Sequence, residues 1–340
     1  MRIKPFGLII AALIVGILLY WVIKPKYSST PTNVPESPSM PSANSNKSND
    51  WNDESTKKTS NDEKTSSTQQ ESRAFDYSPE KPENGTLKGV VELGAAGFNS
   101  FVINLDKKKR WEIVSKDFGQ SLAYEGLATT EDIRAGLKKY IASMLDKGVN
   151  KNDIHFVISS GAQKEPKTET ISNELKKMGY IVNKVTPEQE GQLALKAVLP
   201  PSFADNSYVI DIGSGNTKVS WDENGSLKTI ELPGAKYFEK EMSDADAYSQ
   251  VKSQVNKIPE GKRNVAFIIG GVPFSLAKQT RKGEERYTVL NAPDFYKASD
   301  KKMTSGLNIY KGFVDGTKTD TFVFDWDANF TIGFLLQLNK

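Results

Sequence analysis

The stretch that decides the fold is Tyr208–Trp221, which reads YVIDIGSGNTKVSW. Its first five residues are apolar apart from Asp211, so they predict a buried strand. Gly213 and Gly215 predict a tight turn after that strand, and the residues up to Trp221 predict the strand that returns from it. An acidic residue two positions before a glycine turn therefore characterises this hairpin.

The same arrangement occurs about 120 residues earlier in the chain. Val90–Gly94 predicts a strand that ends at a glycine, with Glu92 two positions before Gly94, and Ser100–Leu105 predicts the returning strand. Two such hairpins predict a duplicated domain with a cleft between the copies. Glycine turns can present backbone N–H groups to phosphate, and a carboxylate at the turn can hold Mg²⁺ or orient water.

Strands and helices alternate beyond Gly85, which predicts a mixed α/β architecture. Residues 130–147 carry an apolar stripe at helical spacing, between Thr129/Thr130 and Gly148 as start and stop signals. Further along we expect strands at 154–159 and 180–185 and helices near 168–178 and at 188–198. A third glycine element, AFIIGGVPFSLA at 266–277, predicts a strand that runs into Gly270 and Gly271 and then a helix.

Composition excludes several kinds of chemistry. The 340 residues carry a net charge of +3, contain no cysteine, and include His155 as the single histidine. A cysteine nucleophile, a zinc site of Cys or His ligands and a disulfide framework are therefore excluded. His155 lies in the apolar run Ile154–Ile158, so a structural role in a strand is favoured over a place in a catalytic triad.

The N-terminal residues predict a membrane anchor. Pro5–Ile23 is an uncharged, mainly apolar stretch that would span about 28 Å as a helix, and no small-residue cleavage site precedes Lys24. We therefore expect residues 1–25 to be a transmembrane signal anchor of a single-pass protein in the cytoplasmic membrane of a bacterium. Basic residues flank the stretch almost equally, and the short N-terminus favours a folded domain outside the cytoplasm.

Three further segments follow the anchor. Residues 26–82 are rich in Ser, Thr, Asn, Pro, Lys and Glu, so we expect a disordered linker with a typical reach of about 40 Å. The folded part then divides into a first lobe at 83–205 and a second lobe at 206–340, one for each glycine hairpin.

The ordered glycine elements from Val90 to about Lys278 resemble a known family. ELGAAGF at 92–98, TPEQEGQL at 186–193 and GGVPFSLA at 270–277 are similar to elements of the exopolyphosphatase and guanosine-pentaphosphate phosphatase (Ppx/GppA) family. That family belongs to the actin/Hsp70/sugar-kinase superfamily. The resemblance implies a duplicated ribonuclease H-like, actin-like ATPase fold and the hydrolysis of a terminal phosphoanhydride with Mg²⁺ and water.

The resemblance also implies roles for individual residues. Glu190 matches the general base, Asp211 matches the acid of the second hairpin, and Glu92 and Asp211 are the expected metal ligands. The expected phosphate-binding residues are drawn from the glycine turns and one nearby basic position: Gly94, Ala95, Ala96, Gly213, Ser214, Gly215, Asn216, Thr217, Lys164, Gly270 and Gly271. Polyphosphate or a phosphorylated guanosine nucleotide is the implied substrate.

Several positions depart from the family pattern. Lys218 stands where the family has a glutamate, Glu92 stands where it has an aspartate, and Ala96 and Gly97 replace an asparagine and a serine. Pro273 replaces a residue that has an N–H group. Since loss of one preorganised group commonly lowers a rate by orders of magnitude, these changes weigh against efficient catalysis.

Three hypotheses follow for function. The first is a membrane-tethered phosphoanhydride hydrolase, and the second is a catalytically degenerate module that senses a phosphorylated ligand or scaffolds a membrane-associated protein partner. The third is an actin-like or pilus-assembly-like ATPase, which fits the Glu190 element less well. A homodimer is compatible with each of them, and we expect no DNA partner.

Overall fold

The first half of the folded chain forms a five-stranded sheet. The computed structural model describes residues 75–94, 97–118 and 129–338. β1 and β2 form the first glycine hairpin, β3 extends it, and β4 and β5 lie parallel to β1 on its other side, so the strand order is β3-β2-β1-β4-β5. The strand bounds are Thr86–Gly94 (β1), Gly97–Leu105 (β2), Trp111–Phe118 (β3), Ile154–Ile158 (β4) and Val182–Lys184 (β5).

The second half repeats this plan in a six-stranded sheet. β6, β7 and β8 form an antiparallel meander, β9 and β11 lie parallel to β6, and β10 is added at the edge, so the order is β10-β11-β9-β6-β7-β8. The bounds are Ser207–Ile212 (β6), Asn216–Glu223 (β7), Ser226–Pro233 (β8), Val265–Gly270 (β9), Tyr287–Val289 (β10) and Thr321–Asp325 (β11). The duplication predicted from the two hairpins is therefore confirmed.

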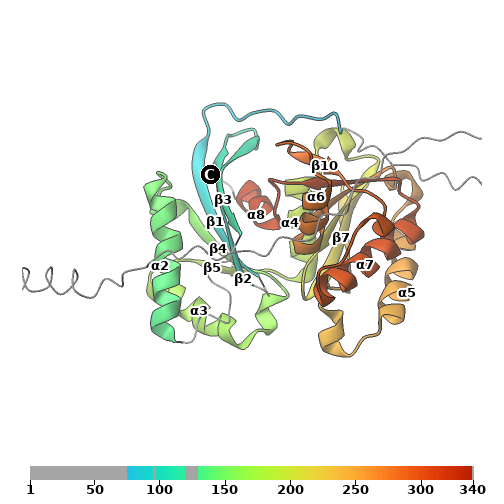
Figure 1. Ribbon diagram of the computed structural model, residues 1–340. Helices are drawn as coiled ribbons and strands as arrows, with labels where there is room; N and C mark the ends of the chain where they lie inside the picture. The colour runs from blue at the N-terminus through green and yellow to red at the C-terminus, as the bar shows by residue number, and fades with distance from the viewer. Residues whose placement is uncertain (1–74, 95–96, 119–128, 339–340) are drawn as a thin grey trace, which may run out of the picture. The chain divides into compact units, whose positions relative to one another are not determined.

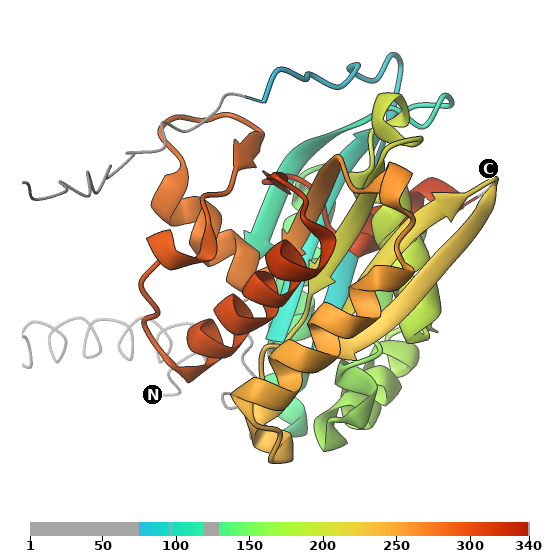
Figure 2. The ribbon, with the colours of Figure 1, turned by 90° about the vertical axis from the view of Figure 1, so that its right-hand side faces the viewer.

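Helices cover both sheets and also lie between them. α2 and α3 pack on the outer face of the first sheet, whereas α5, α6 and α7 pack on the outer face of the second, with α5 and α7 side by side (Figures 1 and 2). α4 and α8 contact each other between the two sheets. The bounds are Thr130–Asp146 (α2), Pro166–Lys177 (α3), Pro187–Val198 (α4), Asp244–Gln254 (α5), Gly271–Thr280 (α6), Lys301–Thr317 (α7) and Phe330–Gln337 (α8).

The starts of two helices follow from local sequence. α2 begins after a capping box in which the Thr129 side chain accepts from the N–H of Asp132, and Asp132 accepts from the N–H of Thr129. α4 begins with the same device between Thr186 and Gln189 and has Pro187 at its first position. This start places Glu190 in the first turn of α4, directly beyond the end of β4.

The middle layer joins the two halves of the sequence. α8 is formed by the last described residues of the chain, and it contacts β1 and β2 of the first sheet as well as α4. Its buried residues share one apolar cluster with Val90 and Phe101 of the first sheet and with Val209 and Phe267 of the second. The two sheets are thus held together by a common core.

Residues 75–83 form a segment that we call the strap. Phe75 packs its ring against Phe203, Phe267 and Tyr287, with ring centroids 5.3–5.7 Å apart. At the other end of the strap, the Glu83 N–H donates to Asp106 at 3.0 Å and the Glu83 carboxylate pairs with Arg110 at 3.1 Å. The strap therefore connects the second sheet to the β2–β3 turn of the first (Figure 1, blue).

The predicted anchor at 5–23 and most of the predicted linker at 26–82 lie outside the described residues. Within the described part of the chain, no helix combines the length and apolar character needed to cross a bilayer. The described residues all belong to one compact unit, which contains their three apolar clusters. A fragment that begins at Ser67 consequently keeps the whole described core.

Candidate functional site

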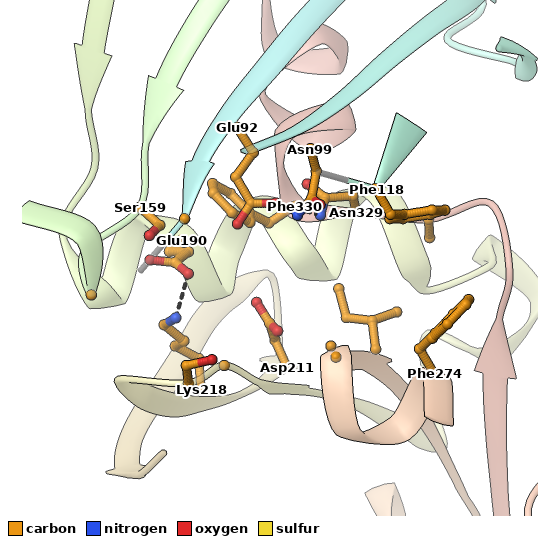
Figure 3. Close-up of a pocket in the computed structure, with 18 of the residues that line it drawn as sticks. Glu92, Asn99, Phe118, Ser159, Glu190, Asp211, Lys218, Phe274, Asn329 and Phe330 are labelled. Carbon is orange, nitrogen blue, oxygen red and sulfur yellow. Dashed lines mark hydrogen bonds and ion pairs between the residues drawn. The ribbon is translucent and has the colours of Figure 1, made fainter. Parts of the chain in front are cut away.

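The carboxyl ends of the parallel strands of both sheets face a common cleft. β1, β4, β6 and β9 all end at this place, and the cleft has a volume of about 360 Å³. It receives Glu92 and Gly94 from the first sheet, Glu190 from α4, and Asp211 and the glycine turn after β6 from the second. Figure 3 shows the three acidic side chains converging on one space. The structure thus brings together the three acidic residues that the sequence and the resemblance singled out, while their roles as base and metal ligands stay predictions.

Both carboxylate oxygens of Glu190 accept from neighbouring donors. It is 2% exposed, and its Oε2 accepts from the Ser160 N–H at 2.8 Å and from the Ser160 hydroxyl at 2.6 Å. Its Oε1 forms an ion pair with the Lys218 ammonium group (Figure 3). Both oxygens of the expected general base therefore already have donors, one of them a full positive charge.

Lys218 is positioned by the second hairpin. It lies in β7 directly opposite Asp211 in β6, and it is 3% exposed. Burial lowers the pKa of a lysine, but the carboxylates of Glu190 and Asp211 outweigh that effect and leave the pKa of Lys218 raised. The side chain is thus held in its charged form among the acids of the cleft.

The pKa values of the other two acidic side chains, Asp211 and Glu92, are raised. Burial raises the pKa of Asp211 to about 6, against the lowering effect of Lys218. Burial also raises the pKa of Glu92 to about 7, although the amides of Asn99 and Asn329 donate to its Oε2 at 2.8 and 2.9 Å. The Oδ1 of Asn329 accepts from the Thr331 N–H at the start of α8, which fixes the amide so that its NH₂ group faces Glu92.

Two glycine elements line the cleft. Ser214 and Gly215 lie in the turn after β6, and no described residue accepts a hydrogen bond from their N–H groups. Gly270 has φ +112°, and a Cβ atom there would lie 2.3 Å from the Ile212 carbonyl oxygen, so only glycine fits. It precedes α6, whose start has no side-chain cap and offers the N–H of Gly271 to an anion.

Lys302 adds a positive charge beside this helix start. It is the second residue of α7, lines the cleft, and places its Nζ 3.8 Å from where a Cβ of Gly271 would lie. Burial and the nearby Lys236 lower its pKa, and it forms no ion pair with any described carboxylate. Its sequence context gave no sign of this role, because the residue is distant from every glycine element along the chain.

Aromatic side chains line one end of the cleft. Phe118 at the end of β3 packs against Phe274 of α6 at 5.7 Å between ring centroids, and Phe274 packs against Trp326 at 5.3 Å. Next to them, Lys116 Nζ bonds the Trp326 carbonyl and the Asp327 carboxylate, both at 2.8 Å. Phe118, Phe274 and Trp326 therefore line this end of the cleft.

Most, but not all, of the predicted phosphate-binding residues meet in the cleft. Gly94, Gly213, Ser214, Gly215, Asn216, Gly270 and Gly271 line it. Thr217 does not, because it is buried and its hydroxyl donates to the Pro233 carbonyl at 2.8 Å. Lys164 is exposed in the short helix Ala162–Lys164 and does not line the cleft. Ala95 and Ala96 lie outside the described residues.

The residues present do not fit a magnesium ion. Mg²⁺ requires oxygen ligands in near-ideal octahedral geometry, usually one or two carboxylates together with water. Here Glu190 is paired with an ammonium group, Asp211 faces the same ammonium group, and Glu92 is turned towards amide donors. Within residues 75–94, 97–118 and 129–338, no group of three or more acidic, histidine or cysteine side chains is arranged to hold a metal.

Sequence reasoning missed the residues that hold Glu190 and Glu92. Ser160 follows β4, and a serine pair with a glycine at the end of a parallel strand, Ser159–Gly161, is a recognisable signal for a site at that edge. Asn329 had no such signal. It lies 237 residues from Glu92, and only the position of α8 between the sheets brings them together.

Comparison with known proteins identifies the fold. No protein-family model matches the chain, and no curated protein sequence matches it. A solved Ppx/GppA family member from Aquifex aeolicus is similar to it with a TM-score of 0.56 and 17% identity, over 74% of this chain and 96% of that one. An exopolyphosphatase from Cytophaga hutchinsonii is similar with a TM-score of 0.57 and 12% identity, over 74% and 96% of the two chains.

The folded part of the chain accordingly has the two-lobed, actin-like α/β fold of the Ppx/GppA phosphatases, in a divergent form. The resemblance inferred from the glycine elements is confirmed at the level of the fold. At identities this low the likeness concerns architecture, so the chemistry has to be argued from the residues of this cleft.

Proposed function

We propose that this domain is a catalytically degenerate binding module that receives a phosphorylated ligand in the cleft. The observation that carries the proposal is the ion pair between Lys218 and Glu190. A general base needs a free lone pair within hydrogen-bond reach of the attacking water. The N–H and hydroxyl of Ser160 on Oε2 and the ammonium group of Lys218 on Oε1 occupy three of the roughly four lone-pair sites of this carboxylate, and a positive charge lies beside the remaining one.

The groups that favour an anion belong to the second half of the fold, in the turn after β6 and at the starts of α6 and α7. They are the N–H groups of Ser214 and Gly215, the start of α6 at Gly271, and the ammonium group of Lys302. Backbone donors at a turn and at a helix start bind phosphate oxygens without a side chain in between.

The acidic side chains that line the cleft repel the same anion. Glu92, Glu190, Asp211 and Asp325 line the cleft, against Lys218 and Lys302. Glu190 and Asp325 are balanced by Lys218 and Arg286, so Glu92 and Asp211 decide the charge that a ligand meets. Because burial raises the pKa values of these two groups to about 7 and about 6, protonation below pH 6 removes most of the repulsion. We expect phosphate binding to be stronger at pH 6 than at pH 8.

The test uses the fragment 67–340 with tripolyphosphate and guanosine pentaphosphate as probes. We expect a ligand-dependent thermal shift without release of phosphate, and we expect Lys302→Glu to weaken binding about tenfold or more, as for loss of a charged hydrogen bond. The neighbouring Lys301→Glu is the matched control, because Lys301 lies over the Phe238 ring and does not line the cleft. Absence of binding of both probes at millimolar concentration, at pH 6 as well as pH 8, would sink the proposal.

Hydrolysis is the second candidate function. In this case Glu190 acts as the general base, with Asp211 beside it, on polyphosphate or a phosphorylated guanosine nucleotide. It is favoured by the convergence of both carboxylates on one cleft in the fold of the phosphoanhydride hydrolases. Release of phosphate from either substrate that is abolished by Glu190→Gln would establish this function and overturn the degenerate one.

The membrane tether remains part of the proposal. An anchor at 5–23 would hold the domain at a bilayer, and the apolar composition of that stretch supports it. Reporter fusions placed after Lys26 report on which side of the membrane the domain lies. Fractionation of the full chain tests the anchor itself, since recovery outside the membrane fraction would contradict it.

A further inference from the structure

A second cavity lies under the strap, away from the cleft. β3 runs between the two cavities, with Phe118 at the cleft end and Trp111 at the other. This second cavity, which we call the strap groove, has a volume of about 780 Å³. Residues 77–80 of the strap, the turn before β3, the end of α4 and the start of β10 line it. It shares no lining residue with the cleft, so it is independent of the function proposed above.

The floor of the strap groove is apolar and aromatic. Trp111 and Tyr287, 9% and 6% exposed, lie at its base with the Arg286 guanidinium 4.4 and 5.3 Å from their ring centroids, and Leu199, Pro201 and Leu336 add apolar surface beside them. Tyr77 of the strap packs against Tyr287 with the ring centroids 5.6 Å apart. Ligand sites of this size are commonly lined by such side chains, with a few polar groups that fix orientation.

The walls of the groove are strongly basic. Lys108, Lys109, Arg110, Lys196 and Arg286 line it, against Glu80 as the acidic member of the lining. The two arginines are already paired, Arg110 with Asp106 at 2.7 Å and Arg286 with Asp325 at 3.0 Å. Lys108 and Lys196 form no ion pair with any described residue, and Lys109 bonds a backbone carbonyl, that of Leu338. Three ammonium groups therefore stand beside the apolar floor without a carboxylate partner in the described part of the chain.

We infer that the strap groove binds an anionic amphiphile, that is, a carboxylate or phosphate headgroup on an apolar chain. The headgroup meets Lys108, Lys109 and Lys196, and the chain lies along the more exposed apolar members of the lining, Leu199, Pro201 and Leu336. A free inorganic anion would use only the lysines, and a neutral apolar molecule only the floor. A ligand that carries both parts satisfies the charge and the apolar surface together.

The direct test is calorimetric titration of the fragment 67–340 with dodecyl phosphate below its micellar concentration. We expect saturable binding at one site. Dodecanol, which lacks the charge, should bind about tenfold more weakly. Inorganic phosphate, which lacks the chain, should bind more than about a hundredfold more weakly. Equal binding of dodecyl phosphate and inorganic phosphate would overturn the inference, because it would describe an anion site alone.

Variants locate the site. The double substitution Lys108→Glu and Lys196→Glu should weaken dodecyl phosphate binding about tenfold or more, since two attractive charges become repulsive. Lys139→Glu on the exposed side of α2 is the matched control and should leave binding unchanged. Trp111→Ala should weaken binding as well. Thermal unfolding of this variant checks that it keeps its fold. Wild-type affinity in the double variant would overturn the assignment to this groove.

A vesicle experiment distinguishes the source of the amphiphile. Co-sedimentation with phosphatidylglycerol vesicles but not with phosphatidylcholine vesicles, lost in the double variant, assigns the groove to an anionic lipid surface. Binding of monomeric dodecyl phosphate without vesicle binding assigns it to a free amphiphile. An acidic peptide that displaces dodecyl phosphate at equal concentration would overturn the inference, since the groove would then be a peptide site.

Discussion

Lys218 and Glu190 form an ion pair that is buried between the two sheets, with Lys218 3% and Glu190 2% exposed. The pair links β7 of the second sheet to the first turn of α4, and α4 in turn belongs to the layer that holds the sheets together. A buried ion pair adds little net stability, but loss of one partner leaves an uncompensated charge in a dry site. Lys218, which pairs with the expected general base Glu190, is consequently also part of the structural core.

The first prediction concerns this pair. Lys218→Met should lower the free energy of unfolding by about 3–5 kcal/mol, because Glu190 is left without its counter-charge. Adding Glu190→Gln should restore most of the loss, since a glutamine keeps an oxygen for Ser160 and carries no charge. Denaturant unfolding of the fragment 67–340 and its two variants measures both values. A loss below about 1 kcal/mol in the single variant would contradict the buried pair.

The second prediction concerns metal. The wild-type fragment should bind no Mn²⁺ in an electron paramagnetic resonance titration, and a chelator should leave its thermal unfolding unchanged. Lys218→Gln removes the ammonium group and leaves Glu92, Glu190 and Asp211 facing one cleft, so this variant should gain a divalent-ion site and be stabilised by Mn²⁺. Lys302→Gln is the control, because Lys302 has no carboxylate partner in the described part. Stoichiometric Mn²⁺ binding by the wild type would refute the prediction.

The third prediction concerns pH. Burial raises the pKa of Glu92 from 4.5 to about 7, so the folded state holds this proton more tightly than the unfolded state does. The corresponding stability is fully present below pH 4.5 and is lost as the pH rises through 7. Glu92→Gln removes this dependence, and we expect it to stabilise the fragment by about 1–3 kcal/mol at pH 8 relative to wild type.

The pH prediction is checked by denaturant unfolding at intervals from pH 5 to pH 8. The difference between wild type and Glu92→Gln should widen in favour of the variant as the pH rises. Glu112→Gln on the neighbouring β3 is a suitable control, since Glu112 lies outside the cleft. Parallel stability curves for wild type and Glu92→Gln would mean that the pKa of Glu92 is not raised.

The fourth prediction concerns the strap. Phe75→Ala should lower the free energy of unfolding by about 2–3 kcal/mol, because four aromatic neighbours lose a packed ring. For the same reason a fragment that begins at residue 83 should melt at a lower temperature than one that begins at residue 67. Thermal unfolding of the two fragments tests the role of the strap, and Ser78→Ala serves as a control that changes no ring contact. Equal melting temperatures would show that the strap does not stabilise the domain.

Sequence alone determined the architecture, for local reasons. The two glycine hairpins, the capping boxes of α2 and α4 and the strand that precedes Gly270 are all encoded within a few neighbouring residues. Apolar runs, glycines and caps act over one turn of helix or one strand, so their signals survive in the sequence. The local signals also predicted that Glu92 and Asp211, each near the end of a hairpin strand, face a cleft, whereas Glu190 was singled out only by the family resemblance.

Only the tertiary structure decided which charged and hydrogen-bonding groups contact those carboxylates. Lys218 contacts Glu190 across 28 positions, and Asn329 contacts Glu92 across 237. Lys302 reaches the cleft from α7, and the strap groove gathers five separate segments of the chain. The charge state and hydrogen bonding of a buried group depend on every neighbour within a few ångströms, and those neighbours are set by how the sheets and the middle helices pack. The position of a residue along the chain does not indicate which residues it will contact in that packing.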